Sequence, residues 1–503
     1  MKEFFSLYTA GLPTVMHIDI ILLLLLGVVI GVMIGALPGL TTTMGVAIVT
    51  PLTYGMNMTA ALALIMGVYC GGAYGGSITA IIAKIPGTPA AMMTTLDGYP
   101  LGRSGHAGRA VGMATVASCI GGIFSVVILS ICATPIAGLA LSFSAQEYFA
   151  VAIFGLCIIA YISNGSIVKG LLSAVLGLLI ATMGMDSITG ILRFTLGNYL
   201  LLDGFEQIPL LIGLFGLSEV LKTVGQRQGK AEVIQNIGRS LPTKADMKEA
   251  VPTILRGSAI GTIVGAIPAA GGTIASIIAY GVEKRVNKKG KNFGNGEICG
   301  VAAPESANNA TTGGAMIPLL TLGVPGDAAG AIMIAALMVH GYTPGPLLFT
   351  NNIDLVSSIY ILMLMANIGF FFVGLGAAKV VGRIINVPAA YFSPIIMLFC
   401  CLGTYSIRCQ VFDVLVLVGF GVLGFLFNRV KMPTAPLILG FILGNLVETG
   451  LRRGLLLASG NVVTFFTRPI STIFLSLSLL LLLTPQIVSL IRKVIKRQQN
   501  DKV

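Results

Sequence analysis

A Pro-Gly interruption inside apolar sequence limits what this chain can fold into more than any other feature. Between Pro304 and Pro346 a polar run, PESANNATTGG, opens an apolar segment that Pro325-Gly326-Asp327 then interrupts. The twelve residues from Gly313 to Val324 would form a helix of about 18 Å, half of a hydrocarbon core. We therefore expect a broken helix, in which Pro325 removes a backbone donor and Gly326 permits positive φ. Such backbone is tolerated at membrane depth only beside a cavity.

Composition places these interruptions in a membrane protein. The chain has 503 residues, of which 55% are hydrophobic and 10% are charged, so it is too apolar for a soluble protein. No alternating strands of a β-barrel occur. We expect an all-α polytopic membrane protein with about 11 to 12 transmembrane helices. The N-terminal apolar run continues into Pro38-Gly39 without a cleavage site, so we expect it to be a retained first span.

Related interruptions occur in both halves of the chain. Pro86-Gly87-Thr88-Pro89 aligns with Pro325-Gly326-Asp327-Ala328. Before each lies a second pair, Gly35 to Thr43 and Gly265 to Thr273, and after each comes Gly98-Tyr99 or Gly341-Tyr342, at offsets of 230 to 243 residues. The pattern predicts two pseudo-symmetric repeats with broken or re-entrant hairpins, and whether the repeats are inverted stays open. Paired interruptions of this kind indicate the substrate site of a secondary transporter.

Basic residues divide the chain and predict its topology. We expect a first half-repeat with extra spans at residues 1–221, a basic cytoplasmic loop at 222–256, a second half-repeat with extra spans at 257–487, and a basic cytoplasmic tail at 488–503. The net charge of +12 therefore reflects the positive-inside rule and not nucleic-acid binding. Basic clusters also flank Ile260 to Ala279, which predicts a re-entrant hairpin there and a similar turn within Ile34 to Val46.

The sequence argues against an enzyme. No nucleophile elbow, Walker loop or dinucleotide fingerprint is present, and the three histidines lack metal-ligand spacing. The eight cysteines are scattered through apolar sequence and are expected to be buried small hydrophobes. We expect no catalytic residues and no cofactor. A passive channel is the main alternative to a transporter, because broken helices also build filters.

Three motifs resemble the large membrane subunit of the tripartite tricarboxylate transporter family. They are PGTPAA from Pro86, PESANNA from Pro304 and GVPGDAA from Gly323, and the resemblance extends over almost the whole chain. It implies a subunit of the bacterial inner membrane that forms the translocation path for di- or tricarboxylates such as citrate. A small membrane subunit and a periplasmic substrate-binding protein are the implied partners, and Na⁺ or H⁺ is the implied coupling ion.

The candidate substrate-binding residues cluster at the interruptions and offer backbone amides, hydroxyls and amide side chains, groups that can replace water around a carboxylate. They are Pro38, Gly39, Thr41, Thr42, Thr43, Gly75, Gly76, Ser77, Pro86, Gly87, Thr88, Pro89, Gly271, Gly272, Thr273, Asn308, Asn309, Thr311, Thr312, Gly313, Gly314, Pro325, Gly326 and Asp327. Asn308, Asn309 and Asp327 are also candidate Na⁺ ligands. The alternative is that the threonines and asparagines only cap helices, and that Asp327 and Glu305 hold helix ends.

Overall fold

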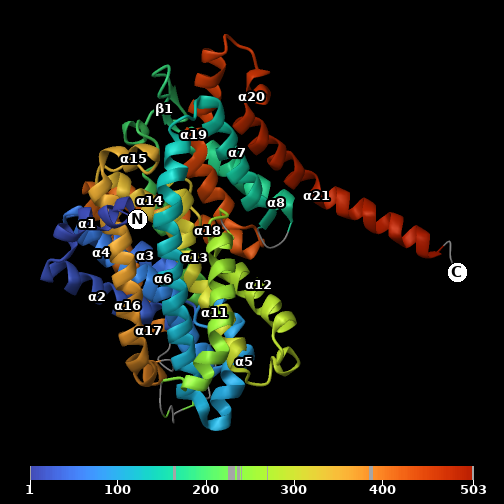
Figure 1. Cartoon of the computed structure of the whole chain (residues 1–503). Helices are drawn as coiled ribbons and strands as arrows, with labels where there is room; N and C mark the ends of the chain where they lie inside the picture. Colours follow the sequence, from blue (N-terminus) through green and yellow to red (C-terminus); the bar gives the residue numbers. More distant parts are fainter. Residues whose placement is uncertain are drawn as a thin grey trace. The chain divides into compact units, whose positions relative to one another are not determined.

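The computed structural model is helical along almost all of the chain (Figure 1) and describes residues 2–162, 166–224, 233–234, 238, 241–268, 270–384 and 389–500. Of the basic residues in the predicted cytoplasmic loop and tail, Arg227, Lys230, Arg239 and Lys502 lie outside the described residues. The described part contains only one two-residue strand pair. The prediction of an all-α polytopic membrane protein is thus confirmed.

Two compact units make up the chain, and each is described by itself. The first combines Met1–Leu141 with Glu206–Phe427. Its helices are α1 (Lys2–Val15), α2 (Ile18–Ala36), α3 (Thr42–Val49), α4 (Met58–Ala83), α5 (Thr94–Leu101), α6 (Ala107–Ala140), α9 (Gln207–Leu211), α10 (Ser218–Val224), α11 (Lys244–Gly265), α12 (Gly271–Val286), α13 (Ile298–Leu322), α14 (Ala328–Val339), α15 (Pro346–Asn351), α16 (Ile353–Ile384), α17 (Ala389–Arg408) and α18 (Val411–Arg429). Short helical turns are η1 (Thr50–Thr53), η2 (Pro89–Met92), η3 (Gly102–His106), η5 (Ile212–Leu217) and η6 (Gly290–Asn292).

Two helices form the core of this unit. α4 packs against α2, and α13 packs against both α6 and α11. Nearly every residue of α4 and α13 is buried. Both helices are rich in Gly, Ala, Ser and Thr, and small residues let helices approach closely enough for backbone to touch backbone. The N-terminal helix α1, which sequence patterns did not predict, packs on α16, where the Gly11 amide donates to Ser357 Oγ at 2.8 Å.

The second unit combines Ser142–Phe205 with Asn428–Val503. It contains α7 (Ala145–Ile162), α8 (Ile167–Ala181), the antiparallel pair β1 (Gly184–Met185) and β2 (Leu192–Arg193), the turn η4 (Tyr199–Leu201), α19 (Thr434–Leu457), α20 (Thr464–Thr467) and α21 (Pro469–Asn500). α19 packs against both α7 and α8.

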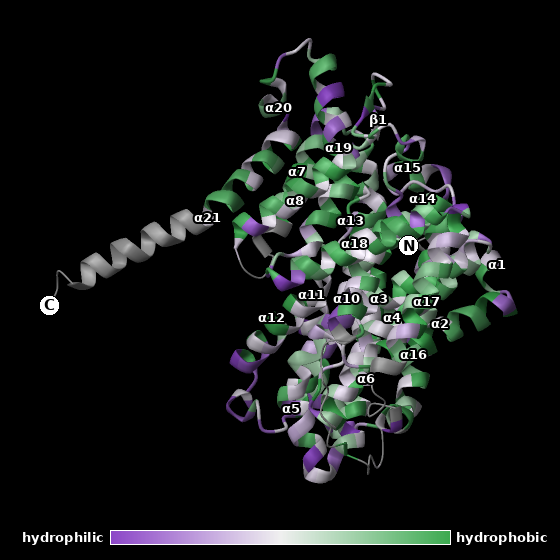
Figure 2. Cartoon of the chain, turned by 180° about the vertical axis from the view of Figure 1, so that it is seen from behind, coloured by the Kyte–Doolittle hydropathy of each residue, from purple (hydrophilic) through white to green (hydrophobic). Residues whose placement is uncertain are grey.

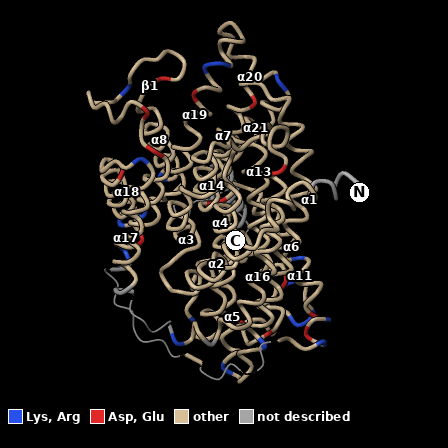
Figure 3. The backbone as a smooth tube through the Cα atoms, turned by 90° about the vertical axis from the view of Figure 1, so that its left-hand side faces the viewer, with Lys and Arg blue, Asp and Glu red and all other residues tan. Residues whose placement is uncertain are grey.

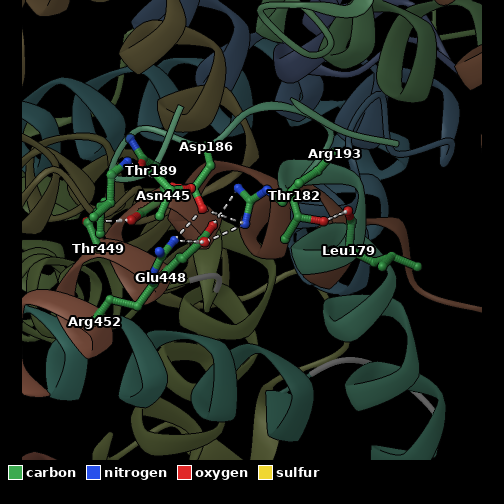
Figure 4. A network of polar contacts seen from close by, with 10 residues as sticks. Leu179, Thr182, Asp186, Thr189, Arg193, Asn445, Glu448, Thr449 and Arg452 are labelled. Atoms are coloured by element: carbon green, nitrogen blue, oxygen red, sulfur yellow. Dashed lines mark hydrogen bonds and ion pairs between the residues drawn. The ribbon is translucent and has the colours of Figure 1, made fainter. Parts of the chain in front are cut away.

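An ion-pair network fixes the β1–β2 hairpin to α19 (Figure 4). Arg452 Nη1 lies 2.6 Å from Asp186 Oδ2, and Arg193 Nη1 lies 2.6 Å from Glu448 Oε1. Backbone amides of Ile188 and Thr189 also donate to Asp186. Hydrogen bonds from these amides and from Arg452 hold the pKa of Asp186 well below its usual range. Ion pairs with α19 therefore hold the segment between Asp186 and Arg193 in place.

Six helices of the described part are long and apolar enough to cross a membrane, namely Ile18–Ala36, Met58–Ala83, Thr94–Ala140, Ile353–Ala378, Val411–Arg429 and Thr434–Leu457. Hydrophobic residues cover most of the helix surfaces, while hydrophilic residues gather in the connections (Figure 2). Charged residues lie mostly near helix ends (Figure 3). This distribution is that of a multi-pass membrane protein. The count of 11 to 12 spans stays a prediction.

The cysteines are all free, and four of them, Cys70, Cys157, Cys299 and Cys400, are buried as expected. The expectation was wrong for Cys409, which is exposed just after α17, in a backbone conformation with φ of 53°. The apolar sequence around it forms a helix end there and not a core.

Candidate functional site

Both predicted turns are present as helix breaks. α11 ends at Gly265 and α12 begins at Gly271, and the two helices fold back on each other because Arg256 and Thr253 of α11 both bond Glu283 of α12. The hairpin within Ile260 to Ala279 is thus confirmed. In the first half, α2 ends at Ala36 and α3 begins at Thr42, with Gly39 at φ of 89°.

The expectation of a short half-helix before Pro325 was wrong. The polar run PESANNATTGG lies inside α13, which extends without interruption over 25 residues from Ile298 to Leu322, about 37 Å. α4 is likewise continuous over 26 residues. Polar residues fit inside these helices because their side chains bond the preceding turn: Thr311 Oγ1 donates to Asn308 O, and Thr312 Oγ1 donates to Asn309 O.

The interruptions are instead tips at which the chain turns back along the preceding core helix. Tip 1 is Pro86 to Pro89, after α4, and tip 2 is Pro325 to Asp327, after α13. Past the end of α4, the Gly87 amide donates to Gly76 O at 3.3 Å, so the chain has returned by about two helical turns. Past the end of α13, a Cβ at Gly326 would lie 2.5 Å from Ala315 Cα. Neither tip glycine has positive φ. Lys84 (φ 58°) and Gly323 (φ 69°) at the helix ends take that conformation, so the tip glycines serve close approach instead.

Glycine rows pack the helix pairs α2–α4 and α11–α13 in the same way. A Cβ at Gly27, Gly31 or Gly35 of α2 would meet the carbonyl oxygens of Leu64, Val68 and Gly72 of α4. A Cβ at Gly257, Gly261 or Gly265 of α11 would meet the carbonyl oxygens of Ala303, Ala307 and Thr311 of α13. Residue numbers rise together in both pairs, so the two helices of each pair are parallel.

The core helices α4 and α13 are antiparallel to each other. Asn308 Nδ2 of α13 donates to Ala73 O of α4 at 2.8 Å, and Thr312, one turn further along α13, bonds Cys70, nearly one turn earlier in α4. Side chains from the first and the second half of the sequence thus contact one another directly between α4 and α13. α14 packs against α3, and η2 packs against α12.

The predicted site residues divide into two groups. Gly75, Gly313 and Gly314 pack against neighbouring helices, and Ser77 bonds Tyr74 O of its own helix. Thr42 lies against Gly72, and Thr41 caps α3 by accepting from the Met44 amide at 3.1 Å, so for Thr41 the capping alternative holds. Pro38 and Thr43 lie beside this cap and are half-buried, and their assignment to the substrate site stays a prediction. The tip glycines lie instead beside Gly76 and Ala315, about two turns before the ends of the core helices. Asp327 and the N-terminus of α12 lie beside Tyr69 and Asn308, near the middle of these helices.

Tip residues contact the core helices through specific polar groups. Asp327 caps α14 by accepting from the Gly330 amide at 2.6 Å, and it also accepts from Tyr69 OH of α4 at 2.8 Å. Thr88 lies against Gly76 of α4. A Cβ at Gly272 would meet Asn308 Oδ1 and would lie 3.4 Å from Ala90 Cβ. Sequence reasoning missed Tyr69. The alignment of the two tips pairs Thr88 with Asp327 at an offset of 239 residues. The same offset pairs Tyr69 with the predicted site residue Asn308, so extending the alignment to the rest of both repeats would have identified Tyr69.

Two buried carboxylates hold the tip-1 region to the second half of the chain. Glu305 of α13 accepts from Thr94 Oγ1 of α5 at 2.5 Å and from Ser118 Oγ of α6 at 3.0 Å. Asp97 of α5 accepts from the amides of Gly294, Gly296 and Glu297 at 2.8 to 3.0 Å and from Tyr280 OH at 2.8 Å. Among the described residues, no lysine or arginine pairs with either carboxylate. These contacts fit the alternative that Glu305 holds a helix in place.

One group of side chains outside the tips has the spacing of a metal site. Ligand atoms of Glu249, Glu297 and Cys299 lie within 4.8 Å of one another. The Lys289 ammonium group lies 2.7 Å from Glu249 Oε1 and 3.9 Å from Glu297 Oε1. Because this ammonium group already lies between the two carboxylates, the group is an ion-pair cluster where the first turns of α11 and α13 meet the connection after α12.

Comparison with known proteins agrees with these features. Residues 21–439 match the family described as "Tripartite tricarboxylate transporter TctA family". An Agrobacterium vitis protein described as "Uncharacterized 52.8 kDa protein in TAR-I ttuC' 3'region" is 34% identical over 503 residues, which is 100% of this chain and 99% of that protein. A second A. vitis protein, "Uncharacterized protein in TAR-II ttuC' 3'region", is 38% identical over 219 residues, 44% of this chain and 90% of that protein. No solved structure matches. The chain belongs to the TctA family of tripartite tricarboxylate transporters.

Proposed function

We propose that this chain is the translocation subunit of an ion-coupled importer of di- or tricarboxylates in the bacterial inner membrane. The observation that carries the proposal is the return of both tips by about two turns along α4 and α13, two helices of the first unit that are buried over nearly their whole length. Helix N-termini at this depth attract carboxylates and need polar partners. Family membership supports a tripartite assembly with a small membrane subunit and a periplasmic substrate-binding protein.

The two halves act in this proposal as inverted repeats. Glycines of α2 and α11 correspond at an offset of 230 residues, and the backbone atoms that they meet in α4 and α13 correspond at 239. Because α4 and α13 are antiparallel, the corresponding elements have opposite directions. Inverted repeats around a midplane site are the architecture of many secondary transporters, which favours coupled transport over catalysis or a passive channel.

The coupling ion in this proposal is Na⁺ or H⁺. Of the candidate Na⁺ ligands, Asn309 best fits, because its Oδ1 is buried and lacks a hydrogen-bond partner among the described residues. Asp327 already accepts two hydrogen bonds, and Asn308 is held by Ala73 O. A buried amide oxygen without a donor is stabilised by a desolvated cation.

Uptake by proteoliposomes tests the proposal. The purified chain, alone and with its small membrane subunit and binding protein, is reconstituted, and radiolabelled citrate, tartrate and other di- and tricarboxylates are offered under an imposed Na⁺ or proton gradient. We expect concentrative uptake that depends on one gradient and rises steeply when both partners are present. Equilibration without accumulation would establish the passive channel, and full rates from the chain alone would establish a stand-alone carrier.

A further inference from the structure

Two corresponding places in the first unit, which we call crossings, differ in whether a side chain caps the backbone amides at the helix N-termini. The capped crossing lies where α14 packs against α3 and contains Thr41, Asp327 and Tyr69. The uncapped crossing lies where η2 packs against α12 and contains Gly271, Gly272, Thr88 and Asn308. Thr88 corresponds to Asp327 and Asn308 to Tyr69, each at an offset of 239 residues. The chemistry at the two crossings can therefore be compared residue by residue.

The capped crossing satisfies its own helix ends. Thr41 Oγ1 accepts from the Met44 amide at the start of α3, and Asp327 Oδ1 accepts from the Gly330 amide at the start of α14. Tyr69 OH donates to the second oxygen of Asp327. A carboxylate of the protein thus already lies at a helix N-terminus, where the helix dipole favours negative charge. A second carboxylate would be repelled there.

The uncapped crossing has no side-chain cap at its helix N-terminus. Ala270, the residue before α12, has no side chain that can cap the helix, and α12 begins with two glycines, the first at φ of 62°. The first amides of a helix lack intrahelical acceptors. Thr88 is only 5% exposed, and its Oγ1 has no hydrogen-bond partner among the described residues. A buried hydroxyl without a partner is rare in folded proteins and needs an explanation.

The η2 segment that follows Thr88 and the side chain of Asn308 both lie beside the N-terminus of α12. Ala90, two residues after Thr88, and Asn308 Oδ1 both lie against the position that a Cβ would take on Gly272. Asn308 donates to Ala73 O and Thr88 lies against Gly76, and these two residues of α4 are neighbours on one helix face. The α12 amides and the Thr88 hydroxyl are donors that suit an anion, and Asn308 Oδ1 is the acceptor beside them, whereas the capped crossing already contains the carboxylate of Asp327.

We propose that the cargo carboxylate binds at the uncapped crossing, on the N-terminus of α12 and the Thr88 hydroxyl, and that Asp327 occupies the corresponding position at the capped crossing. This inference rests on the proposed function and deepens it, because it assigns different roles to two corresponding tips. Thr88 contacts the cargo. Asp327 and Tyr69 are positioning residues that hold tip 2 against α4.

Binding of citrate to the purified chain, measured by calorimetry beside the melting temperature of each variant, tests the assignment. Thr88→Val removes a hydroxyl that has no internal partner, so we expect an unchanged or raised melting temperature together with at least tenfold weaker citrate binding. Thr88→Ser should restore binding. Thr88→Asp, which places a carboxylate as at the capped crossing, should abolish it. Gly272→Ala should weaken binding because its Cβ meets Asn308, whereas Gly281→Ala on the same helix meets nothing within 4 Å and is the matched control.

Tyr69→Phe and Asp327→Asn provide the contrast at the capped crossing. We expect both to lower the melting temperature and the maximal uptake rate while leaving the citrate Kd within twofold of the wild type. An equal loss of affinity in both sets of variants, or unchanged binding in Thr88→Val, would overturn the assignment while leaving the proposed function intact. Failure of the wild-type chain to bind any di- or tricarboxylate would overturn the proposed function and the assignment together.

Discussion

The Asp97 carboxylate should be the most sensitive single point of attachment between tip 1 and the second half of the chain. Its Oδ1 accepts from three backbone amides and its Oδ2 from Tyr280 OH. A hydrogen bond to a charged group contributes about 1.5 to 3 kcal/mol and a neutral one about 0.5 to 1.5 kcal/mol. Asp97→Asn keeps the shape but removes the charge, so we expect it to cost about 1 kcal/mol for each amide bond, or about 3 kcal/mol in all.

Two further variants set the scale. Asp97→Ala leaves three amides without an acceptor, at about 1 to 3 kcal/mol each. Gly294 is exposed and Gly296 half-buried, so water replaces part of this loss, and the lower half of that range is expected. Tyr280→Phe removes one bond and should cost about 1 kcal/mol.

Thermal unfolding in detergent, followed with a dye that reacts with the buried cysteines, measures these effects. We expect the melting temperatures to fall in the order Tyr280→Phe, Asp97→Asn, Asp97→Ala, with Asp203→Asn, at an exposed acid, unchanged. If Asp97→Asn and Asp203→Asn have the same melting temperature, the charge of Asp97 contributes nothing to stability and the reasoning is refuted.

Three other predictions concern pH, topology and the tips. Hydrogen bonds from Arg109 above all, and further ones from Thr243, lower the pKa of Asp246 to about 2, below its unfolded value of about 3.9. Its stabilisation is therefore complete above about pH 4 and is lost as pH falls towards 2. It amounts to at most about 2.6 kcal/mol, less whatever solvent screens at the partly exposed Arg109. The difference in melting temperature between wild type and Asp246→Asn should therefore vanish over that interval, and a constant difference would contradict the prediction. In a background without the native cysteines, a cysteine at Lys288, in the basic α12–α13 connection, should resist an impermeant thiol reagent in intact cells. A cysteine at Leu196, in the loop after β2 that contains no lysine or arginine from Phe194 to Glu206, should react; the reverse pattern would invert the topology. Gly87→Val and Gly326→Val should abolish transport while folded protein stays in the membrane, because their side chains meet Gly76 Cα at 2.9 Å and Ala315 Cα at 2.5 Å; Gly281→Val is the control, and transport by both tip variants would show that the tips are only structural.

The sequence by itself determined the class of protein, the family and the places where helices break. These follow from local chemistry, since proline removes a donor, glycine lacks a side chain, and apolar composition is read without knowing any contact. The chain accordingly breaks between α2 and α3, between α11 and α12, and at the two tips, as expected. The division at residues 221 and 256 and the coupling ion stay predictions.

Only the tertiary structure decided which polar stretches continue a helix and which end it. Asn308, Asn309 and the threonines after them read as a helix start, yet they lie inside α13, because glycine rows let α11 come close enough to shield them. The contact of Asp327 with Tyr69 and the antiparallel pairing of α4 with α13 through Asn308 also depend on residues more than 200 positions apart. Local sequence is nearly the same at both tips, PGTPA and PGDAA. The caps themselves are local, since Thr41 and Asp327 each accept from an amide three residues later. The fold alone decides that Tyr69 lies beside one tip and that Asn308 lies beside the N-terminus of α12, because these partners are distant in sequence.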